Sequence, residues 1–190
     1  MAVNKNNVVM HGASGKLGNN VVFRQRGGVT IVSKTPFRSS GYIPTANQQE
    51  QQIKFTEAAF YAKSAMLDPS LKNAYANKAK GNQSAYNVAV KDYLTAPLLA
   101  SANFSSYTGE IGSTITLAIS DVLAVVTVKI ALYTSDGALV EEGMAVQDAV
   151  NAMFWVYTAT AENTPISGMV LMAYLTSTPG NVYEHELVIP

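Results

Sequence analysis

Residues 115–132 read ITLAISDVLAVVTVKIAL, two β-prone runs on either side of the polar pair Ser120-Asp121. Large apolar residues alternate with small or polar ones in both runs, most clearly in residues 126–130. A period of two is typical of strands that bury one face of a sheet. This stretch therefore predicts a β domain in the C-terminal half of the chain.

The β pattern continues toward the C-terminus in runs that are separated by turn signals. The turn signals are Ser135-Asp136-Gly137, Ser167-Gly168 and Pro179-Gly180-Asn181, and the further runs cover residues 139–140, 154–157, 169–175 and 182–189. About seven short strands between residues 104 and 190 have the number and spacing of an immunoglobulin-like β-sandwich. We expect Trp155 to pack in or near the core of this domain.

Residues 45–97 have a helical period instead, and they open with a long first helix. Apolar side chains three or four positions apart mark its expected buried face. They are Ile53, Phe55, Ala58, Ala59, Ala62, Ala65 and Met66. Because many of them are alanines, other helices can approach closely.

Two shorter helices are expected to complete a compact three-helix cluster in this region. Asp68-Pro69 reads as an N-cap followed by proline in the first turn, and Gly81 fits the end of that helix. A third helix is predicted from about Ser84 to Leu94, since the proline at position 97 cannot continue a helix.

Residues 1–44 contain a hairpin signal around Gly27-Gly28. The β-prone runs 21–26 and 29–33 flank the two glycines, and both central positions of a type I′ turn need a positive φ. Alternation divides the side chains between two faces, one with Phe23 and Val32 and the other with Arg24, Arg26 and Ile31. Because a lone hairpin is marginally stable in water, we expect this β-hairpin arm to need a partner surface.

Formal charge divides the chain into two opposite halves. Twelve of the thirteen lysines and arginines fall in residues 1–97 beside four acidic residues, so this half carries +8. Residues 98–190 hold nine acidic residues and Lys129, which gives −8. Surfaces of opposite charge attract each other, either within one chain or between neighbouring copies.

Composition limits the class of protein. The 190 residues are 48% hydrophobic and 14% charged, which is enough apolar material to bury real cores. We expect no membrane insertion, because no apolar run is long enough to span a bilayer. Residues 1–7 lack the features of a secretory signal, which leaves a cytoplasmic, virion-associated or leaderless exported protein as expectations. With no cysteine, disulfides and thiolate chemistry are excluded.

The string Gly12-Ala13-Ser14-Gly15-Lys16-Leu17-Gly18 has some features of a phosphate-binding loop. It lacks the four-residue gap between the glycines and the Ser or Thr after the lysine. A hairpin is expected after it, so no helix N-terminus would face a phosphate. We interpret the string as a tight turn that enters a strand, and we expect no cofactor.

The titratable residues offer no anchor for catalysis or metal binding. His11 and His185 could share a metal only if the termini met, and neither has a recognised ligand spacing. No nucleophile motif organises the serines, and Glu141 and Glu142 would point to opposite faces of a strand. We therefore expect no catalytic residue, no metal ligand and no small-molecule substrate, and we expect that the protein is not an enzyme.

Nucleic-acid binding is an alternative that the basic half keeps open. Basic residues near the hairpin are accompanied by aromatic residues that can stack on bases: Arg24, Arg26, Lys34 and Arg38, with Phe37 and Tyr42. Their density is low, no recognised binding module is present, and the acidic half would repel phosphates. A nucleic-acid partner is therefore expected to be less favoured than another copy of the protein.

A set of motifs spread over the chain occurs together in one group of proteins. The N-terminal motifs are His11-Gly12, Gly15-Lys16, Gly18, Arg26-Gly27-Gly28, Ile31-Val32-Ser33-Lys34 and Pro36. The later motifs are Phe55, Ala58, Tyr75, Ala79, Ser84-Ala85-Tyr86-Asn87, Gly109, Asp136-Gly137, Trp155, Tyr157 and Pro179-Gly180-Asn181. In these motifs the chain resembles, over nearly its whole length, a group of uncharacterised proteins from Bacteroidota. The resemblance implies a three-part architecture and transfers no activity to any residue.

These observations lead to an α+β protein with a β-hairpin connector arm (1–44), a helical cluster (45–97) and an immunoglobulin-like sandwich of about seven strands (104–190). Our functional hypothesis is a structural subunit that assembles head-to-tail with itself into a filament, tube or shell. The residues expected at the interface are Val22, Phe23, Arg24, Arg26, Ile31 and Val32. A structural protein of a phage capsid or tail is an alternative, as is the nucleic-acid-binding protein.

Overall fold

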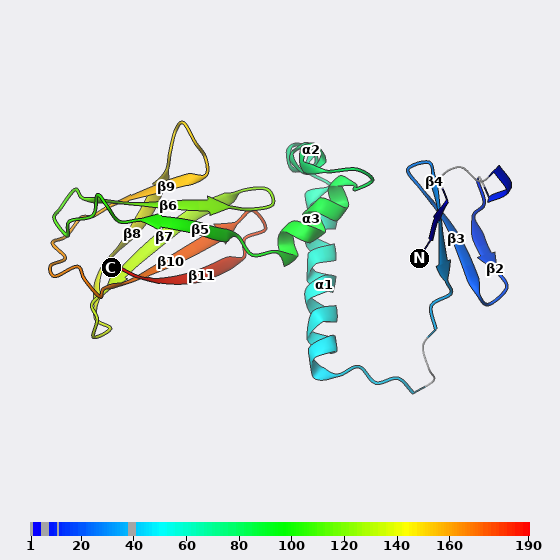
Figure 1. Ribbon diagram of the computed structural model, residues 1–190, viewed down its shortest axis with the longest axis horizontal. Helices are drawn as coiled ribbons and strands as arrows, with labels where there is room; N and C mark the ends of the chain where they lie inside the picture. The colour runs from blue at the N-terminus through cyan, green and yellow to red at the C-terminus, as the bar shows by residue number, and fades with distance from the viewer. Residues whose placement is uncertain (1, 5–7, 11, 38–40) are drawn as a thin grey trace. The chain divides into compact units, whose positions relative to one another are not determined.

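The computed structural model describes residues 2–4, 8–10, 12–37 and 41–190 (Figure 1). Within these residues the chain is mixed α+β, with three α-helices, a four-stranded sheet and a seven-stranded sheet. It divides into two compact units. The N-terminal unit comprises residues 1–53 and 80–83, and the main unit comprises residues 54–79 and 84–190.

The N-terminal unit contains an antiparallel sheet with the strand order β1-β4-β3-β2. Its elements are β1 (Ala2–Asn4), η1 (Val8–Met10), β2 (Gly15–Leu17), β3 (Val21–Arg26) and β4 (Val29–Lys34). β3 and β4 pair around Gly27 and Gly28, whose φ angles of 56° and 74° are both positive. The sequence analysis expects a hairpin alone, whereas in the structure two short strands flank it.

The register of β3 and β4 fixes the two faces of this sheet. Phe23 stands opposite Val32, and Arg24 stands opposite Ile31, so the members of each pair share a face, as the alternation predicts. The end of η1 and the segment that follows it are hydrogen-bonded to β3 and β4. Gln25 Nε2 donates to the carbonyl oxygen of Ala13 at 2.7 Å, and Thr30 Oγ1 donates to that of Met10 at 3.3 Å.

The three helices begin where local capping chemistry allows. They are α1 (Ala46–Ala65), α2 (Pro69–Lys78) and α3 (Ala85–Leu94). Asp68 Oδ1 accepts a 2.8 Å hydrogen bond from the amide of Ser70, which confirms the predicted N-cap. Ser84 caps α3 by accepting from the amide of Asn87, at the approximate start that the sequence predicts. The predicted end of α2 at Gly81 is wrong, because the helix ends at Lys78 with an extended cap at Ala79.

The helical core forms around the C-terminal half of α1. Its buried members are Ala62, Ala65, Tyr75, Val88 and Ala89, and Ala58 is also fully buried. Ile53 and Phe55, which the sequence analysis places on the same buried face, are 60% and 57% exposed. α2 and α3 are each half as long as α1 and pack on its later turns, so the earlier turns stay open to solvent.

The β domain of the main unit is a seven-stranded antiparallel sheet with the order β11-β10-β7-β8-β9-β6-β5. The strands are β5 (Leu98–Asn103), β6 (Thr114–Ser120), β7 (Val125–Tyr133), β8 (Leu139–Gln147), β9 (Phe154–Thr158), β10 (Val170–Ser177) and β11 (Val182–Val188). β8 pairs first with β7 and then, at Val146 and Gln147, with β9. The sheet therefore curls around one core, nearly as a barrel does.

That core explains the apolar sequence between residues 122 and 132. Val128, Ile130 and Leu132 of β7 are fully buried, because they share the face of this central strand that points into the core. Trp155 is 6% exposed and belongs to the same core, as predicted. Val122 precedes β7 and packs on the helical core instead, so residues 122–132 contribute side chains to both hydrophobic cores.

Candidate functional site

The six residues that the sequence analysis assigns to assembly all lie on β3 and β4. Val22, Phe23, Ile31 and Val32 are half-buried, and Arg24 and Arg26 are exposed. The register places most of them on one surface, the basic face, which consists of Lys16, Val22, Arg24, Arg26, Val29, Ile31 and Ser33. Phe23 and Val32 lie on the opposite face, so the structure does not bring all six residues together.

The N-terminal sheet has very little interior. Thr30, at 3% exposed, is its one buried residue among those whose burial is described, and neither hydrophobic core contains a residue of this sheet. β1 and β2 each pair with one neighbour, which leaves the outer edge of each strand without a ladder partner within the described residues. Unpaired strand edges and half-exposed valines are surfaces that other strands can cover.

The connection between α2 and α3 contributes a contact that the sequence analysis missed. Asn82 Nδ2 donates to the carbonyl oxygen of Arg26 at 3.0 Å, and both residues belong to the N-terminal unit. A Cβ atom at Gly27 would collide with the side-chain amide of Asn82. Glycine is therefore favoured at position 27 for two reasons: its φ is positive, and the absence of a Cβ leaves space for the Asn82 side chain.

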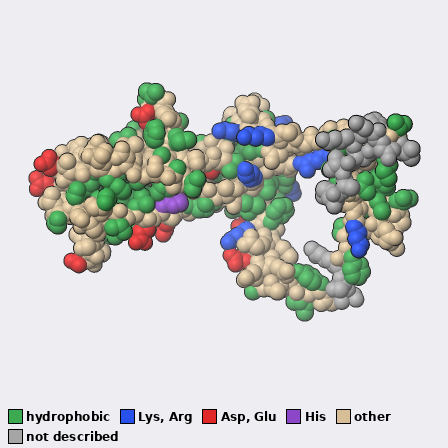
Figure 2. All heavy atoms as spheres, in the orientation of Figure 1, with side chains coloured by type: hydrophobic (Ala, Val, Ile, Leu, Met, Phe, Trp, Pro, Cys, Tyr) green, Lys and Arg blue, Asp and Glu red, His purple; other side chains and the backbone are tan. Residues whose placement is uncertain are grey.

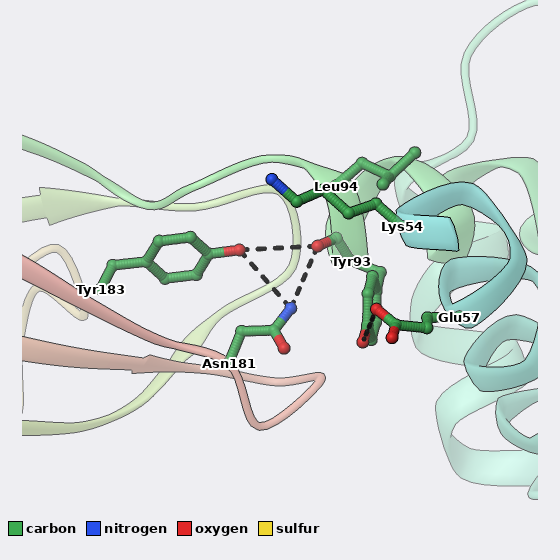
Figure 3. Close-up of a pocket in the computed structure, with 6 residues that line it drawn as sticks. All are labelled: Lys54, Glu57, Tyr93, Leu94, Asn181 and Tyr183. Atoms are coloured by element: carbon green, nitrogen blue, oxygen red, sulfur yellow. Dashed lines mark hydrogen bonds between the residues drawn. The ribbon is translucent and has the colours of Figure 1, made fainter. Parts of the chain in front are cut away.

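In the main unit, a crevice of about 290 Å³ lies where the helices meet the β domain (Figure 3). Its lining residues are Lys54, Glu57, Tyr93, Leu94, Asn181 and Tyr183. Asn181 Nδ2 donates to the carbonyl oxygen of Tyr93 at 3.1 Å, and the Tyr183 hydroxyl approaches the same oxygen at 3.5 Å. A carbonyl of the last turn of α3 thus finds its partners on the β domain.

The residues of this crevice form contacts between α3 and the β domain and do not form a recognisable catalytic group. The Tyr93 hydroxyl lies 3.5 Å from Glu57 Oε2, and partial burial, with the Glu57 charge, raises the pKa of the Tyr93 phenol. None of the six lining residues is a histidine, serine or threonine, so no familiar nucleophile and base pair is formed here. The crevice residues hold α3 against the turn between β10 and β11.

The buried carboxylate of Asp92 is a second contact between the helices and the β domain. Asp92 of α3 is fully buried; its Oδ2 accepts from the Tyr75 hydroxyl at 2.6 Å and its Oδ1 from the amide of Leu123 at 3.2 Å. Burial raises the pKa of Asp92. Burial also raises the pKa of Asp121 to about 6, with the charge of Asp92 adding to the effect.

The sequence offers one signal that Asp92 is buried. It lies three and four residues after Ala89 and Val88, which are buried on the same face of α3.

Glu141 and Glu142 face opposite sides of β8, as predicted. Glu142 is exposed and forms a 2.8 Å ion pair with Lys129. Glu141 is buried and accepts hydrogen bonds from the amide and hydroxyl of Thr160 and from the side-chain amide of Asn163. Burial alone would raise the pKa of Glu141, but these hydrogen bonds lower it overall. This carboxylate fixes the loop after β9 and belongs to the interior.

The other sequence-level candidates do not come together. Within residues 2–4, 8–10, 12–37 and 41–190, no group of three or more His, Asp or Glu side chains could hold a metal. His185 lies half-buried on β11, and His11 lies outside the described residues, as does Arg38. The glycine-rich string 12–18, interpreted above as a tight turn that enters a strand, leads into β2 and then into the turn before β3. No helix in the described part of the chain has the length and apolar character needed to cross a bilayer.

Comparison with known proteins adds little to this description. Neither a protein-family model nor a curated protein sequence matches the chain. Among solved structures, CopC from Methylosinus trichosporium OB3b is similar to this chain at 20% identity, with a TM-score of 0.36. The similarity covers 48% of this chain and 88% of that chain. A likeness of this size transfers neither fold nor function.

Proposed function

We propose that the protein is a structural subunit that assembles with copies of itself into a filament, tube or shell. The observation that carries this proposal is the four-stranded N-terminal sheet with open edges and almost no buried side chain among its described residues. A small sheet gains stability when another surface covers its apolar residues or extends its edges. A second copy of the chain is a partner that is always present at matching concentration.

The charges of the two compact units support contacts between copies. The N-terminal unit has seven lysines and arginines and one acidic residue, a formal charge of +6. The main unit has six basic and twelve acidic residues, a formal charge of −6. Opposite charges on two parts of one subunit favour head-to-tail contact, which repeats into an open polymer when it does not close into a ring.

The main unit suits the role of a spacer. Lettered A to G in chain order, β5-β6-β9 stand as A-B-E and β7-β10-β11 as C-F-G, with β8 as the link, which is compatible with an immunoglobulin-like sandwich. On this proposal the arm spans residues 1–44, the helical cluster 45–97 and the sandwich 104–190. The contacts of Asp92 and Asn181 would keep helices and sandwich in one piece as neighbours pull on the arm.

Negative-stain microscopy and sedimentation velocity of concentrated full-length protein test the proposal. We expect concentration-dependent particles or fibres, and we expect deletion of residues 1–35 to abolish them while the β domain stays folded. A chain that stays monomeric at high concentration, with a protease-sensitive N-terminal unit, would overturn the proposal. An assembly that tolerates the deletion would place the connector elsewhere.

The charge of +6 on the N-terminal unit also favours the nucleic-acid alternative. Binding to phosphates weakens steeply with salt, because each contact releases counterions. DNA retardation that falls steeply between low and physiological salt, without particles in the microscope, would support that function. Persistent self-assembly without DNA retardation would support the structural role, whether in a phage virion or in another repeating array.

A further inference from the structure

The outer face of the seven-stranded sheet carries an ordered set of acidic side chains. The register aligns two rows across β11, β10, β7 and β8: Glu186, Met172, Ala131 and Glu142 in one, and Glu184, Tyr174, Lys129 and Met144 in the other. The alternate residues of these strands, such as Leu171 and Leu175, fill the core. The two rows therefore point away from the core, and we call this surface the acidic face.

Two glutamates of the acidic face lack a basic neighbour across the sheet. Lys129 is bridged to Glu142, whereas the residues opposite Glu184 and Glu186 are Tyr174 and Met172. Both glutamates are exposed and lie on β11, an edge strand of the sheet. In Figure 2, acidic side chains lie along the part of the β domain that β11 occupies in Figure 1.

Apolar side chains accompany these charges. Val182 and Val188, at the two ends of β11, are 58% and 62% exposed, and Met144 on β8 is 55% exposed. The surface thus combines negative charge with apolar area that water covers poorly. Mixed surfaces of this kind, placed at a sheet edge, are typical of protein contacts.

The basic face of the N-terminal sheet has the complementary pattern. Arg24 and Arg26 are two residues apart on β3, as Glu184 and Glu186 are on β11, so each pair is spaced by roughly 6.5–7 Å. Val22, Val29 and Ile31 supply half-buried apolar area beside the arginines. The basic face contains no acidic residue, and arginine pairs well with carboxylates.

We infer that the basic face of one copy docks on the β11 side of the acidic face of the next copy. This inference rests on the proposed function and names the receiving surface for the N-terminal sheet. The arginines of β3 face the glutamates of β11, and valines and isoleucine of the sheet cover Val182 and Val188. Each subunit has one basic face and one acidic face, so the contact is head-to-tail and repeats.

Charge reversal on full-length protein tests the inference by sedimentation velocity. One variant carries Arg24→Glu and Arg26→Glu, and the other carries Glu184→Lys and Glu186→Lys. Each variant alone should need a roughly tenfold or higher concentration to assemble. An equal mixture of the two should assemble, because each reversed face then meets a complementary face on the other variant. The control, Glu110→Lys with Glu162→Lys, changes the net charge equally at exposed sites outside the acidic face and should assemble as the wild type does.

The outcomes separate the inference from the proposed function. If the variant with Arg24→Glu and Arg26→Glu does not assemble while the variant with Glu184→Lys and Glu186→Lys assembles normally, the N-terminal sheet is the connector and the receiving surface lies elsewhere. If both fail and their mixture also fails, the two faces do not contact each other, and the inference is wrong. If the wild type is monomeric throughout, the proposed function fails first. Circular dichroism of each variant establishes that the exposed substitutions leave the fold intact.

Discussion

The hydroxyl group of Tyr75 donates a 2.6 Å hydrogen bond to the fully buried carboxylate of Asp92. The same hydroxyl lies 2.7 Å from that of Tyr61, so three polar groups form a chain inside the helical core. One oxygen of Asp92 also accepts from the amide of Leu123, which precedes β7. The helices and the β domain therefore share a polar interior contact, whose loss should weaken both.

Tyr75→Phe should lower the free energy of unfolding by roughly 1–3 kcal/mol, because the carboxylate of Asp92 would keep its burial and lose a donor. Urea denaturation at neutral pH measures the change. Tyr86→Phe is the matched control, since its hydroxyl has no hydrogen-bond partner among the described residues and its removal should cost less. Equal losses in the two variants would contradict this role for Tyr75.

Asp121 should make stability fall as pH rises from about 4 to about 6. Its pKa in the folded protein is about 6, raised from 3.8 chiefly by burial, so the folded state binds the proton more tightly than the unfolded state does. The stabilising proton is present below pH 4 and is lost as pH rises through 6. Asp121→Asn should flatten this slope and gain on the order of 1 kcal/mol at pH 7, a figure reduced for the partial exposure of the group. Paired urea denaturations of wild type and variant from pH 4 to 7 measure the difference; a difference that does not change with pH would refute the prediction.

Neighbouring glutamates on β8 should respond very differently to removal. Glu141→Ala should cost roughly 2–4 kcal/mol, because the donors from Thr160 and Asn163 would be left buried without an acceptor. Glu142→Ala removes an exposed ion pair with Lys129 and should cost less than about 1 kcal/mol. Thermal and chemical denaturation of both variants gives the comparison, and a larger loss for Glu142 would reverse our assignment.

The two glycines of the β3–β4 turn should not be equivalent. Alanine at either position strains a positive φ, but at Gly27 it would also push the Asn82 amide away from the carbonyl of Arg26. At Gly28 a Cβ would meet nothing within 4 Å. We expect Gly27→Ala to destabilise the sheet by about 1 kcal/mol more than Gly28→Ala. Amide hydrogen exchange of β3 and β4 measures this, and equal exchange in the two variants would mean that the Asn82 contact is unimportant.

Local signals were sufficient for much of the fold. Asp68 and Ser84 start helices because their own side chains accept hydrogen bonds from amides of the first turn. Gly27-Gly28 forms a turn that needs two positive φ angles, which few other residue pairs can adopt. These features depend on a few neighbouring residues, which the sequence displays directly. The alternation in β7 was an equally clear signal, since Val128, Ile130 and Leu132 are alternate residues that all lie in the core.

Other features depend on partners that a sequence pattern does not name. Ile53 and Phe55 have the spacing of a buried face, yet α2 and α3 are too short to reach them. β5 was not predicted, because only the first two of residues 98–103 are large and apolar, and four of the six are exposed at the sheet edge. Asp92 looks like a surface residue until Tyr75 and Leu123 are brought to it by the fold. The interface role of the six arm residues is still a prediction, for which the charge-reversal experiment is the test.

The chain enters the N-terminal unit twice, once through residues 1–53 and again through residues 80–83. Tension applied to the N-terminal sheet would therefore be divided between the covalent path into α1 and the hydrogen bond from Asn82 to Arg26. In the proposed polymer this hydrogen bond, which contributes about 1 kcal/mol, would break before any helix unwinds and could re-form when the force is released.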